Sequence, residues 1–206
     1  MTDSKQDNHR SRDSSLGTSL LEGLRTQDPE AWKRAVHLYY PLVRKWCKGF
    51  GLQPQDTADV AQETFRTLAG AIGRFRREEG KNSFRGWLWG ITRKLVANYR
   101  RRQKASLIGA GGTEAQKRLA QVPDESEKDA SVVRPANERT LVLRRALGLL
   151  KAEVEPRTWQ AFWRVVVEGQ APADVASDLG LTTNAIYLLK ARLLRRLREE
   201  FGELLD

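Results

Sequence analysis

The sequence predicts an all-α protein with two small helical domains joined by a flexible linker, and three observations support this fold class. Apolar side chains recur at three- and four-residue steps through most of the chain, as on one face of a helix. No segment alternates apolar and polar residues, and β-branched residues are thinly spread, which argues against strands. Residues 103–135 contain no aromatic residue, and this break separates the two helical parts.

We divide the 206 residues into four parts on this basis. Residues 1–18 are polar, rich in serine and aperiodic, which is typical of a disordered tail. Residues 19–102 form the first helical domain and residues 136–206 the second. Residues 103–135 carry equal numbers of acidic and basic side chains with scattered Gly and Pro. As a flexible coil this linker spans roughly 30 Å on average.

Composition narrows the partners and the compartment. The formal net charge of +10 fits either a polyanionic partner or a merely soluble basic protein, and charge alone leaves both open.

The single cysteine, Cys47, excludes an internal disulfide, and with only His9 and His37 beside it no zinc site is expected. We expect no metal and no cofactor. No apolar run approaches the roughly 20 residues of a membrane span, and the polar start lacks a signal peptide, so we expect a cytoplasmic protein without membrane insertion.

The first domain reads as three helices. The first begins after Asp28, with Pro29 as its first residue and Pro41 as a kink or a division. Its predicted buried stripe is Trp32, Val36, Tyr39, Val43 and Trp46. The second starts at Asp56 or Thr57. Its predicted buried face is Ala61, Phe65 or Thr64, Leu68, Ile72 and Phe75, and its opposite face carries Asp59, Gln62, Glu63 and Arg66.

The third helix, from about residue 84 to 103, combines an apolar side with a strongly basic one. The predicted apolar side is Phe84, Leu88, Ile91, Leu95 and Tyr99, and the other side is Trp89, Arg93, Val96 and Arg100. From residue 74 to 104 there are eleven basic side chains and two acidic ones, a pattern that predicts a phosphate-binding stripe. On this outer side, Trp89 fits two roles equally well, stacking on an unpaired base or packing against the first helix.

The last part of the second domain has the layout of a helix-turn-helix that reads DNA. Val175, Ala176 and Leu179 give one helix an apolar edge, and Gly180 permits the positive φ of the turn. Thr182 is placed to cap the second helix. On that helix Thr183, Asn184 and Tyr187 are candidates for base edges, and Lys190, Arg192 and Arg195 for phosphates. A solvated helix end is the alternative for Arg195 and the arginines after it. Leu188 points outward with no assigned role.

Two motifs in this order carry a family resemblance. Asp59-Val60-Ala61-Gln62-Glu63-Thr64-Phe65, followed by Phe84-Arg85-Gly86-Trp87-Leu88-Trp89-Gly90-Ile91-Thr92-Arg93, resembles region 2 of a bacterial sigma-70 family factor. The terminal helix-turn-helix resembles region 4 of the same family. With only a linker between them, the chain is similar to the compact extracytoplasmic-function (ECF) group. Tyr187 and Leu189 depart from the basic residues that are frequent at these places in the family.

The resemblance implies partners and roles. It assigns docking on the clamp helices of the largest β-type subunit of core RNA polymerase to the face with Asp59, Gln62, Glu63 and Arg66. From spacing alone, an ordinary solvated face fits these four better. The resemblance further implies promoter DNA contacts by the third helix, with Asn82 and Ser83 beside a flipped base, a contact of region 4 with the β flap, and control by an anti-sigma factor.

The sequence therefore predicts a sigma factor that binds core polymerase, recognises promoter DNA, melts it and starts transcription. We expect no enzymatic activity and no catalytic residues, because no nucleophile and base pair, phosphate loop or metal cluster is visible. The alternative is a helix-turn-helix transcriptional regulator that acts without core polymerase. An enzyme acting on nucleic acid is disfavoured by the missing metal ligands.

Overall fold

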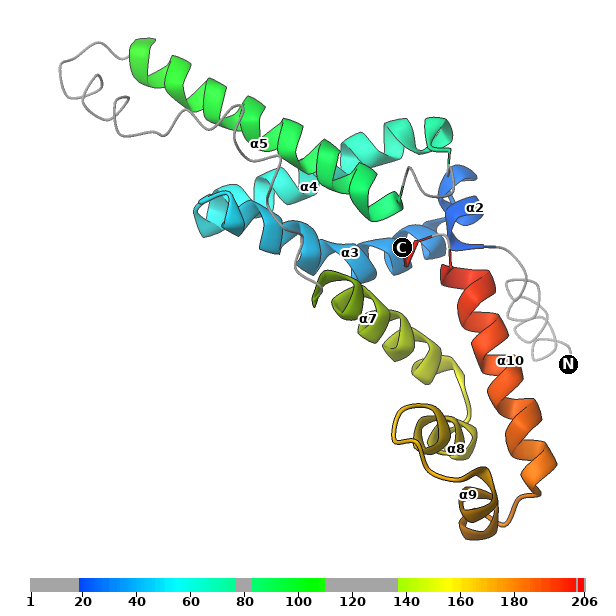
Figure 1. Ribbon diagram of the computed structural model, residues 1–206. Coiled ribbons are helices and arrows are strands. Elements are labelled where there is room, and N and C mark those ends of the chain that lie inside the picture. The colour runs from blue at the N-terminus through cyan, green and yellow to red at the C-terminus, as the bar shows by residue number, and fades with distance from the viewer. Residues whose placement is uncertain (1–18, 77–82, 110–136, 203, 206) are drawn as a thin grey trace, which may run out of the picture. The chain divides into compact units, whose positions relative to one another are not determined.

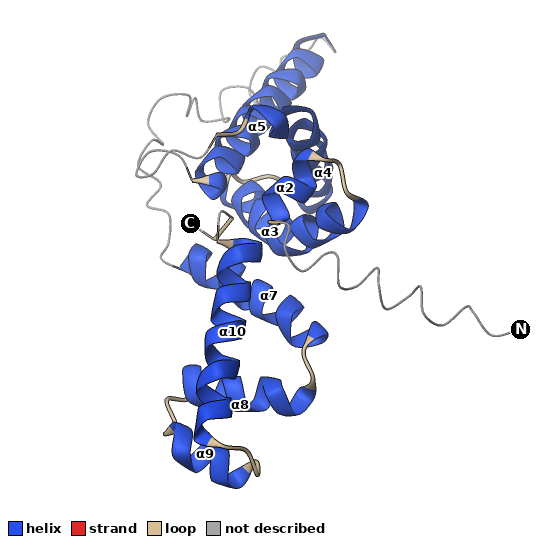
Figure 2. Cartoon of the chain, turned by 90° about the vertical axis from the view of Figure 1, so that its right-hand side faces the viewer, coloured by secondary structure: helices blue, strands red, loops and turns tan. Residues whose placement is uncertain are grey.

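The computed structural model describes residues 19–76, 83–109, 137–202 and 204–205. Within them it contains helices and loops and no strand, so the predicted all-α fold class is confirmed (Figure 2). The tail predicted over residues 1–18 and the part of the predicted linker from residue 110 to 135 lie outside the described residues.

The helices follow one another along the chain as labelled in Figure 1. In order they are α2 (Leu20–Arg25), α3 (Pro29–Gly49), α4 (Pro54–Ala71), the 3₁₀ turn η1 (Ile72–Arg74), α5 (Phe84–Gly109), α7 (Asn137–Glu153), α8 (Pro156–Val166), α9 (Pro172–Asp178) and α10 (Thr183–Phe201). Pro41 lies inside α3 and does not divide it. The third helix ends later than predicted, at Gly109. Residues 103–109, predicted to begin the linker, continue α5 instead, since residues 103–108 contain no Gly or Pro.

The chain forms two compact units. The first comprises Met1–Leu38 and Leu141–Asp206, and the second comprises Tyr39–Thr140. These contact units differ from the domains predicted at 19–102 and 136–206, because α3 and α7 each cross from one unit into the other. A compact unit need not coincide with a functional domain, so the two functional domains at 19–102 and 136–206 stay a prediction.

The core of the second unit is an aromatic cluster around Phe84, the first residue of α5. The Phe84 ring is fully buried and lies 5.1 Å from the ring centre of Tyr39, 5.6 Å from that of Phe75 and 6.1 Å from that of Trp87. α4 packs against α5 in this unit. The first turn of α7 is also held here, because the Trp46 indole donates a buried 2.7 Å hydrogen bond to Glu138.

Buried threonines belong to the packed faces of α4 and α5. On α4, of the two residues left open, Thr64 is buried and Phe65 is only half-buried. On α5 Thr92 is fully buried and Val96 is only 2 % exposed, so the prediction of Val96 on the outer side is wrong. The Thr64 and Thr92 hydroxyls each donate to the carbonyl one turn earlier, at 2.8 Å. Because this bond satisfies the hydroxyl, threonine can join an apolar stripe.

The stripe predicted on α3 is correct only in its second half. Tyr39, Val43 and Trp46 are buried as expected, but Val36 is 37 % exposed. Ala35 and Leu38 are buried in its place. The prediction followed the large side chains and therefore included Val36. The residue that is buried at this place is the small Ala35.

The helix-turn-helix of the first unit forms as predicted. Gly180 has a φ of +56°, and the Leu181 N–H donates to the Ala176 carbonyl at 2.8 Å, which closes the end of α9. The Thr182 hydroxyl accepts from the Ala185 N–H at 3.1 Å and caps α10. The small core beneath the turn consists of Ala161, Val165, Val175, Ala176 and Ile186, with Leu179, Leu181 and Leu189 packed against it.

Glu155 caps α8 and makes this helix sensitive to acid. Its carboxylate accepts from the Thr158 N–H and hydroxyl, both at 3.0 Å, and from the Arg157 N–H at 3.2 Å. The Thr158 N–H first, and then the other donors, lower the pKa of Glu155. A depressed pKa in the folded state stabilises the protein above the ordinary glutamate pKa, and this contribution is lost as pH falls through the folded pKa.

We therefore expect Glu155→Gln to lower the melting temperature at neutral pH and to flatten its fall in acid. Thermal unfolding of both proteins between about pH 7 and pH 3 checks this. Parallel curves for the two proteins would contradict the role of the carboxylate.

Candidate nucleic-acid and polymerase interfaces

The four side chains predicted for polymerase docking lie together on the outer face of α4. Asp59, Gln62, Glu63 and Arg66 are all exposed, and we call them the α4 face. Arg66 and Glu63 form an ion pair at 3.1 Å, one helical turn apart. Because both partners are exposed, this pair contributes little to stability and leaves the face free to change partners.

A groove of about 270 Å³ connects the α4 face with α5. It is lined by Asp59, Val60, Gln62, Glu63 and Arg66 from α4 and by Leu95, Asn98, Tyr99 and Arg102 from α5. Asn98, Tyr99 and Arg102 were not predicted on this surface, since the pairing of two helices is not visible in the spacing of one. A strip of α5 is therefore continuous with the α4 face.

Tyr99 contributes a neutral hydroxyl to this groove. Burial first, and then a hydrogen bond with Asp56, raise the pKa of Tyr99. The Gln103 amide donates to the Tyr99 oxygen at 2.6 Å. The hydroxyl therefore stays protonated at physiological pH and acts as a fixed polar group.

On α5 the structure shows packing contacts for the predicted DNA residue Trp89. Its half-buried ring lies 6.4 Å from the ring centre of Phe50, and the Arg93 guanidinium lies over the Trp89 ring at 5.5 Å. Arg100 donates to the Phe50 carbonyl. Trp89 and Arg100 thus contact Phe50, the residue that follows α3, and Arg93 contacts Trp89. Of the two roles left open for Trp89, packing is the one with contacts in this structure.

Ser83 acts as a helix cap in this structure. Its hydroxyl oxygen accepts from the Gly86 N–H at 3.0 Å at the start of α5. Asn82, the other residue predicted beside a flipped base, lies outside the described residues. The cap fixes where α5 begins, and so it places the basic side chains that follow.

On α10 the predicted DNA residues occupy about the first four turns. Tyr187 is 55 % exposed, a large fraction for an aromatic side chain. Lys190 is half-buried. The start of α10 thus presents hydrogen-bonding groups and, along its flank, positive charge. The other predicted residues are all exposed, and they are Thr183, Asn184, Arg192 and Arg195.

Leu188, which had no assigned role, lines a second groove. Its side chain is 64 % exposed. The groove has a volume of about 720 Å³ and runs along α10 beside the corner between α7 and α8. It is lined by Glu153, Val154, Glu155, Thr158, Ala185, Leu188, Leu189, Arg192, Leu193, Arg195, Arg196 and Glu199.

The described residues contain no group of three or more His, Cys, Asp or Glu side chains arranged to hold a metal ion. Cys47 is buried, and burial raises the pKa of its thiol to about 11. The thiol is therefore protonated near neutral pH and unreactive. None of the described helices is both long and apolar enough to cross a membrane.

A comparison with known protein families gives a match in the middle of the chain. Residues 35–106 match the family model for sigma-70 region 2. This match contains both sequence motifs, the α4 face and the basic part of α5. No curated protein matches the chain in sequence.

Solved structures similar to this chain include two complexes. One is the RsbN–BldN complex, with 18% identity and a TM-score of 0.36 over 86% of this chain and 96% of that chain. The other is the sigma factor RpoE in complex with the anti-sigma factor NepR from Bartonella quintana, with 18% identity and a TM-score of 0.33 over 81% of this chain and 94% of that chain. The similarity to the sigma-70 family therefore rests on the region 2 match, which covers residues 35–106 of this chain.

Proposed function

We propose that the protein is a sigma factor of the extracytoplasmic-function type, a dissociable subunit that brings core RNA polymerase to promoters and helps melt the DNA. The observation that carries this proposal is the region 2 match at residues 35–106 together with a helix-turn-helix at 172–201. A regulator that needs only an operator requires the second of these and has no use for the first. Such a factor works in the cytoplasm, where core polymerase and promoters are found.

In this proposal the α4 face binds the clamp helices of the largest β-type polymerase subunit. The face is polar and of mixed charge, with Asp59, Glu63 and Arg66 exposed. Charged surfaces of this kind tune the association rate and the salt sensitivity of a complex that must later come apart. Tyr99 and Arg102 extend the contact onto α5.

The start-proximal promoter element is bound by the basic stripe of α5. Arg93 and Arg100 hold its phosphates, and phosphate contacts of this kind supply affinity without reading sequence. The Ser83 cap supports this role, because it fixes the start of the helix that carries both arginines.

The upstream element is bound by α10. Thr183, Asn184 and Tyr187 meet its base edges. The apolar Leu188 beside them gives the second groove a surface for the β flap of polymerase or for an anti-sigma factor. The phosphates of this element are held by Lys190, Arg192 and Arg195.

We expect Glu63→Lys to weaken binding to core polymerase by about ten-fold or more, and Gln62→Ala by less, because charge reversal adds repulsion while the amide loss removes a single polar contact. Equilibrium titration of labelled protein with purified core polymerase measures both. Glu30→Lys is the matched control, since Glu30 is exposed on α3 and outside the α4 face.

Glu63→Lys and the control Glu30→Lys, which change the net charge equally, should bind duplex DNA equally well, because neither substitution touches α10. If Glu63→Lys and Gln62→Ala bind core polymerase as tightly as the unsubstituted protein, the docking assignment is wrong. If the unsubstituted protein does not bind core polymerase and still binds DNA, the sigma proposal is wrong. The alternative, a transcriptional regulator that acts without core polymerase, then explains the result better.

A further inference from the structure

Two arginines of α8 contact the end of α9, and we call these the two arginine contacts. Arg157 donates to the carbonyl of Leu179, the residue that follows α9. Arg164 donates to the carboxylate of Asp178, the last residue of α9, at 2.5 Å. Positions that are seven apart lie on the same face of a helix. One face of α8 therefore holds the end of the first helix of the helix-turn-helix.

Arg164 has its partners within the protein. Its side chain is only 19 % exposed, and besides Asp178 it donates to the Gln170 side-chain oxygen at 2.6 Å, in the loop before α9. The Gln170 N–H donates to the Arg164 carbonyl at 2.9 Å. Arg164 thus connects α8, the loop and the end of α9. Because its guanidinium already has two acceptors, we do not count it among the DNA contacts.

The end of α9 needs such partners because the helix is short. α9 has 7 residues, and a helix of this length is unstable by itself. Carbonyls at a helix end have no partner within the helix, and a carboxylate at this end is disfavoured by the helix dipole. Arg157 supplies a donor for the Leu179 carbonyl, and Arg164 neutralises Asp178. A Cβ at Gly180 would lie 3.4 Å from the Arg157 nitrogen, so glycine also leaves room for the first contact.

The end of α9 determines where α10 begins. Only residues 179–182 lie between the two helices. The Leu181 N–H donates back to the Ala176 carbonyl of α9, and the Thr182 hydroxyl caps α10. A shift of the end of α9 therefore moves the first turn of α10, which carries the side chains proposed to meet base edges.

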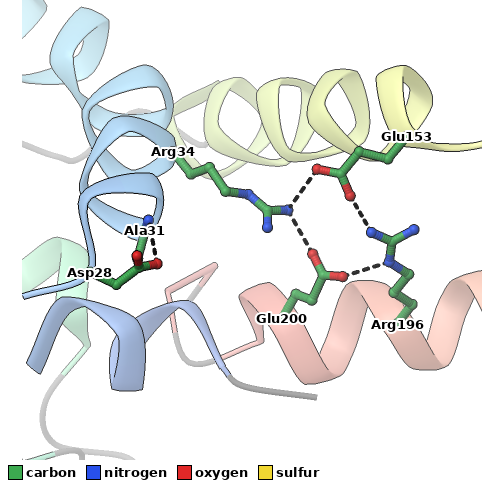
Figure 3. A network of polar contacts seen from close by, with 6 residues as sticks. All are labelled: Asp28, Ala31, Arg34, Glu153, Arg196 and Glu200. Carbon is green, nitrogen blue, oxygen red and sulfur yellow. Dashed lines mark hydrogen bonds and ion pairs between the residues drawn. The ribbon is translucent and has the colours of Figure 1, made fainter. Parts of the chain in front are cut away.

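The opposite end of α10 is held separately, by a ring of four charged side chains (Figure 3). Arg196 contacts Glu200 at 2.5 Å and also pairs with Glu153, the last residue of α7. Arg34 completes the ring, with one guanidinium nitrogen 2.7 Å from Glu200 and 3.4 Å from Glu153. Since the ring holds the far end of α10, the orientation of its DNA-reading end depends on α9.

We propose that Arg157 and Arg164 are positioning residues, which hold α9 so that the start of α10 presents its base-reading side chains in one orientation. They act through the protein and bind no DNA. Phosphate contacts supply affinity without reading sequence, whereas hydrogen bonds to base edges depend on accurate distance and angle. Loss of the two arginine contacts should therefore reduce sequence preference more than general DNA affinity. This role rests on the proposed reading of DNA by α10.

The test compares two duplexes with the full-length protein. Selection from random sequences with the unsubstituted protein gives a preferred duplex, and a shuffled version of it is the second. Asp178→Ala removes the partner of Arg164 together with one negative charge, so electrostatics alone predicts tighter binding to both duplexes and an unchanged affinity ratio. We expect the ratio to fall by about two- to five-fold, a modest effect because Asp178 is exposed.

A double variant, Arg157→Ala with Asp178→Ala, removes both arginine contacts and leaves the net charge unchanged. We expect it to bind the shuffled duplex as the unsubstituted protein does, with the same salt dependence, while the affinity ratio falls further than in Asp178→Ala. If Arg157 held a phosphate, the slope of log affinity against log salt would fall by about one. The control is Asp174→Ala, which makes the same charge change as Asp178→Ala in the first turn of α9 and should leave the ratio unchanged.

Amide hydrogen exchange separates local loosening from unfolding and needs no DNA. In the double variant the Leu181 N–H, which is bonded to the Ala176 carbonyl, should exchange several-fold faster. The amides in the second half of α8 should exchange as in the unsubstituted protein. Unchanged exchange at Leu181 would show that the two arginine contacts do not hold α9.

The binding measurements decide the positioning role. An unchanged affinity ratio in the double variant, or a lower salt slope, would overturn it. If the unsubstituted protein prefers no sequence, base reading by α10 and the positioning role both fail, while the exchange of Leu181 still decides whether the arginines hold α9.

Discussion

Replacement of Phe84 by alanine is expected to lower the free energy of unfolding of the second unit by about 3–5 kcal/mol, the usual cost of removing a buried phenylalanine. The Phe84 ring is fully buried, and the rings of Tyr39, Phe75 and Trp87 surround it. Tyr39 and Trp87 are carried by α3 and α5 and Phe75 follows η1, and these backbones cannot all close on the space left behind. Urea unfolding followed by circular dichroism measures the loss.

Phe65→Ala is the control for this prediction. Phe65 is only half-buried on α4, and its ring lies 6.2 Å from the ring centre of Tyr40. We expect a clearly smaller loss of stability at this position. A loss at Phe84 no larger than that at Phe65 would show that the aromatic cluster is not the core of this unit.

The double substitution Arg192→Glu and Arg195→Glu is expected to weaken binding to duplex DNA of arbitrary sequence by about ten-fold or more at moderate salt. Both side chains are exposed on α10, beside the residues proposed to meet base edges. Two phosphate contacts are lost and two repulsions are introduced. The slope of log affinity against log salt should also fall by about two.

The matched control is a second double substitution, Lys151→Glu and Arg198→Glu, which changes the net charge by the same amount. Lys151 is exposed on α7, and Arg198 is exposed on α10 beyond the turns that carry the proposed DNA contacts. Near the carboxyl end of a helix, a cation such as Arg198 interacts with the helix dipole. Titration of a labelled duplex at several salt concentrations should show a clearly smaller change for this variant. An equal loss in both double variants would mean that only net charge matters.

Features set by neighbouring residues could be predicted from the sequence. The helix-turn-helix is of this kind, because Gly180 and Thr182 act on backbone groups within a few positions of themselves. The exposed face of α4 is another, since Asp59 and Glu63 repeat at helical spacing. The buried stripe of α5 was misplaced because the prediction did not include Thr92, whose buried hydroxyl is satisfied within its own helix.

Features that depend on distant contacts could not be predicted. Tyr99 and Arg102 line the groove at the α4 face only because α5 lies beside α4. The packing of Trp89 beside Phe50 likewise depends on where the end of α3 lies, which the spacing within α5 does not indicate. The ring that includes Arg34 and Glu200 connects residues 166 positions apart, and nothing in the local sequence around either residue indicates the other.

Promoter-dependent transcription by purified core RNA polymerase tests the central claim most directly. Addition of the full-length protein should give transcripts that start at defined sites on genomic DNA fragments, and core polymerase alone should not. Glu63→Lys should reduce these transcripts while Glu30→Lys should not. Transcription that is the same with and without the protein, together with no binding of the protein to core polymerase, would contradict the assignment as a sigma factor.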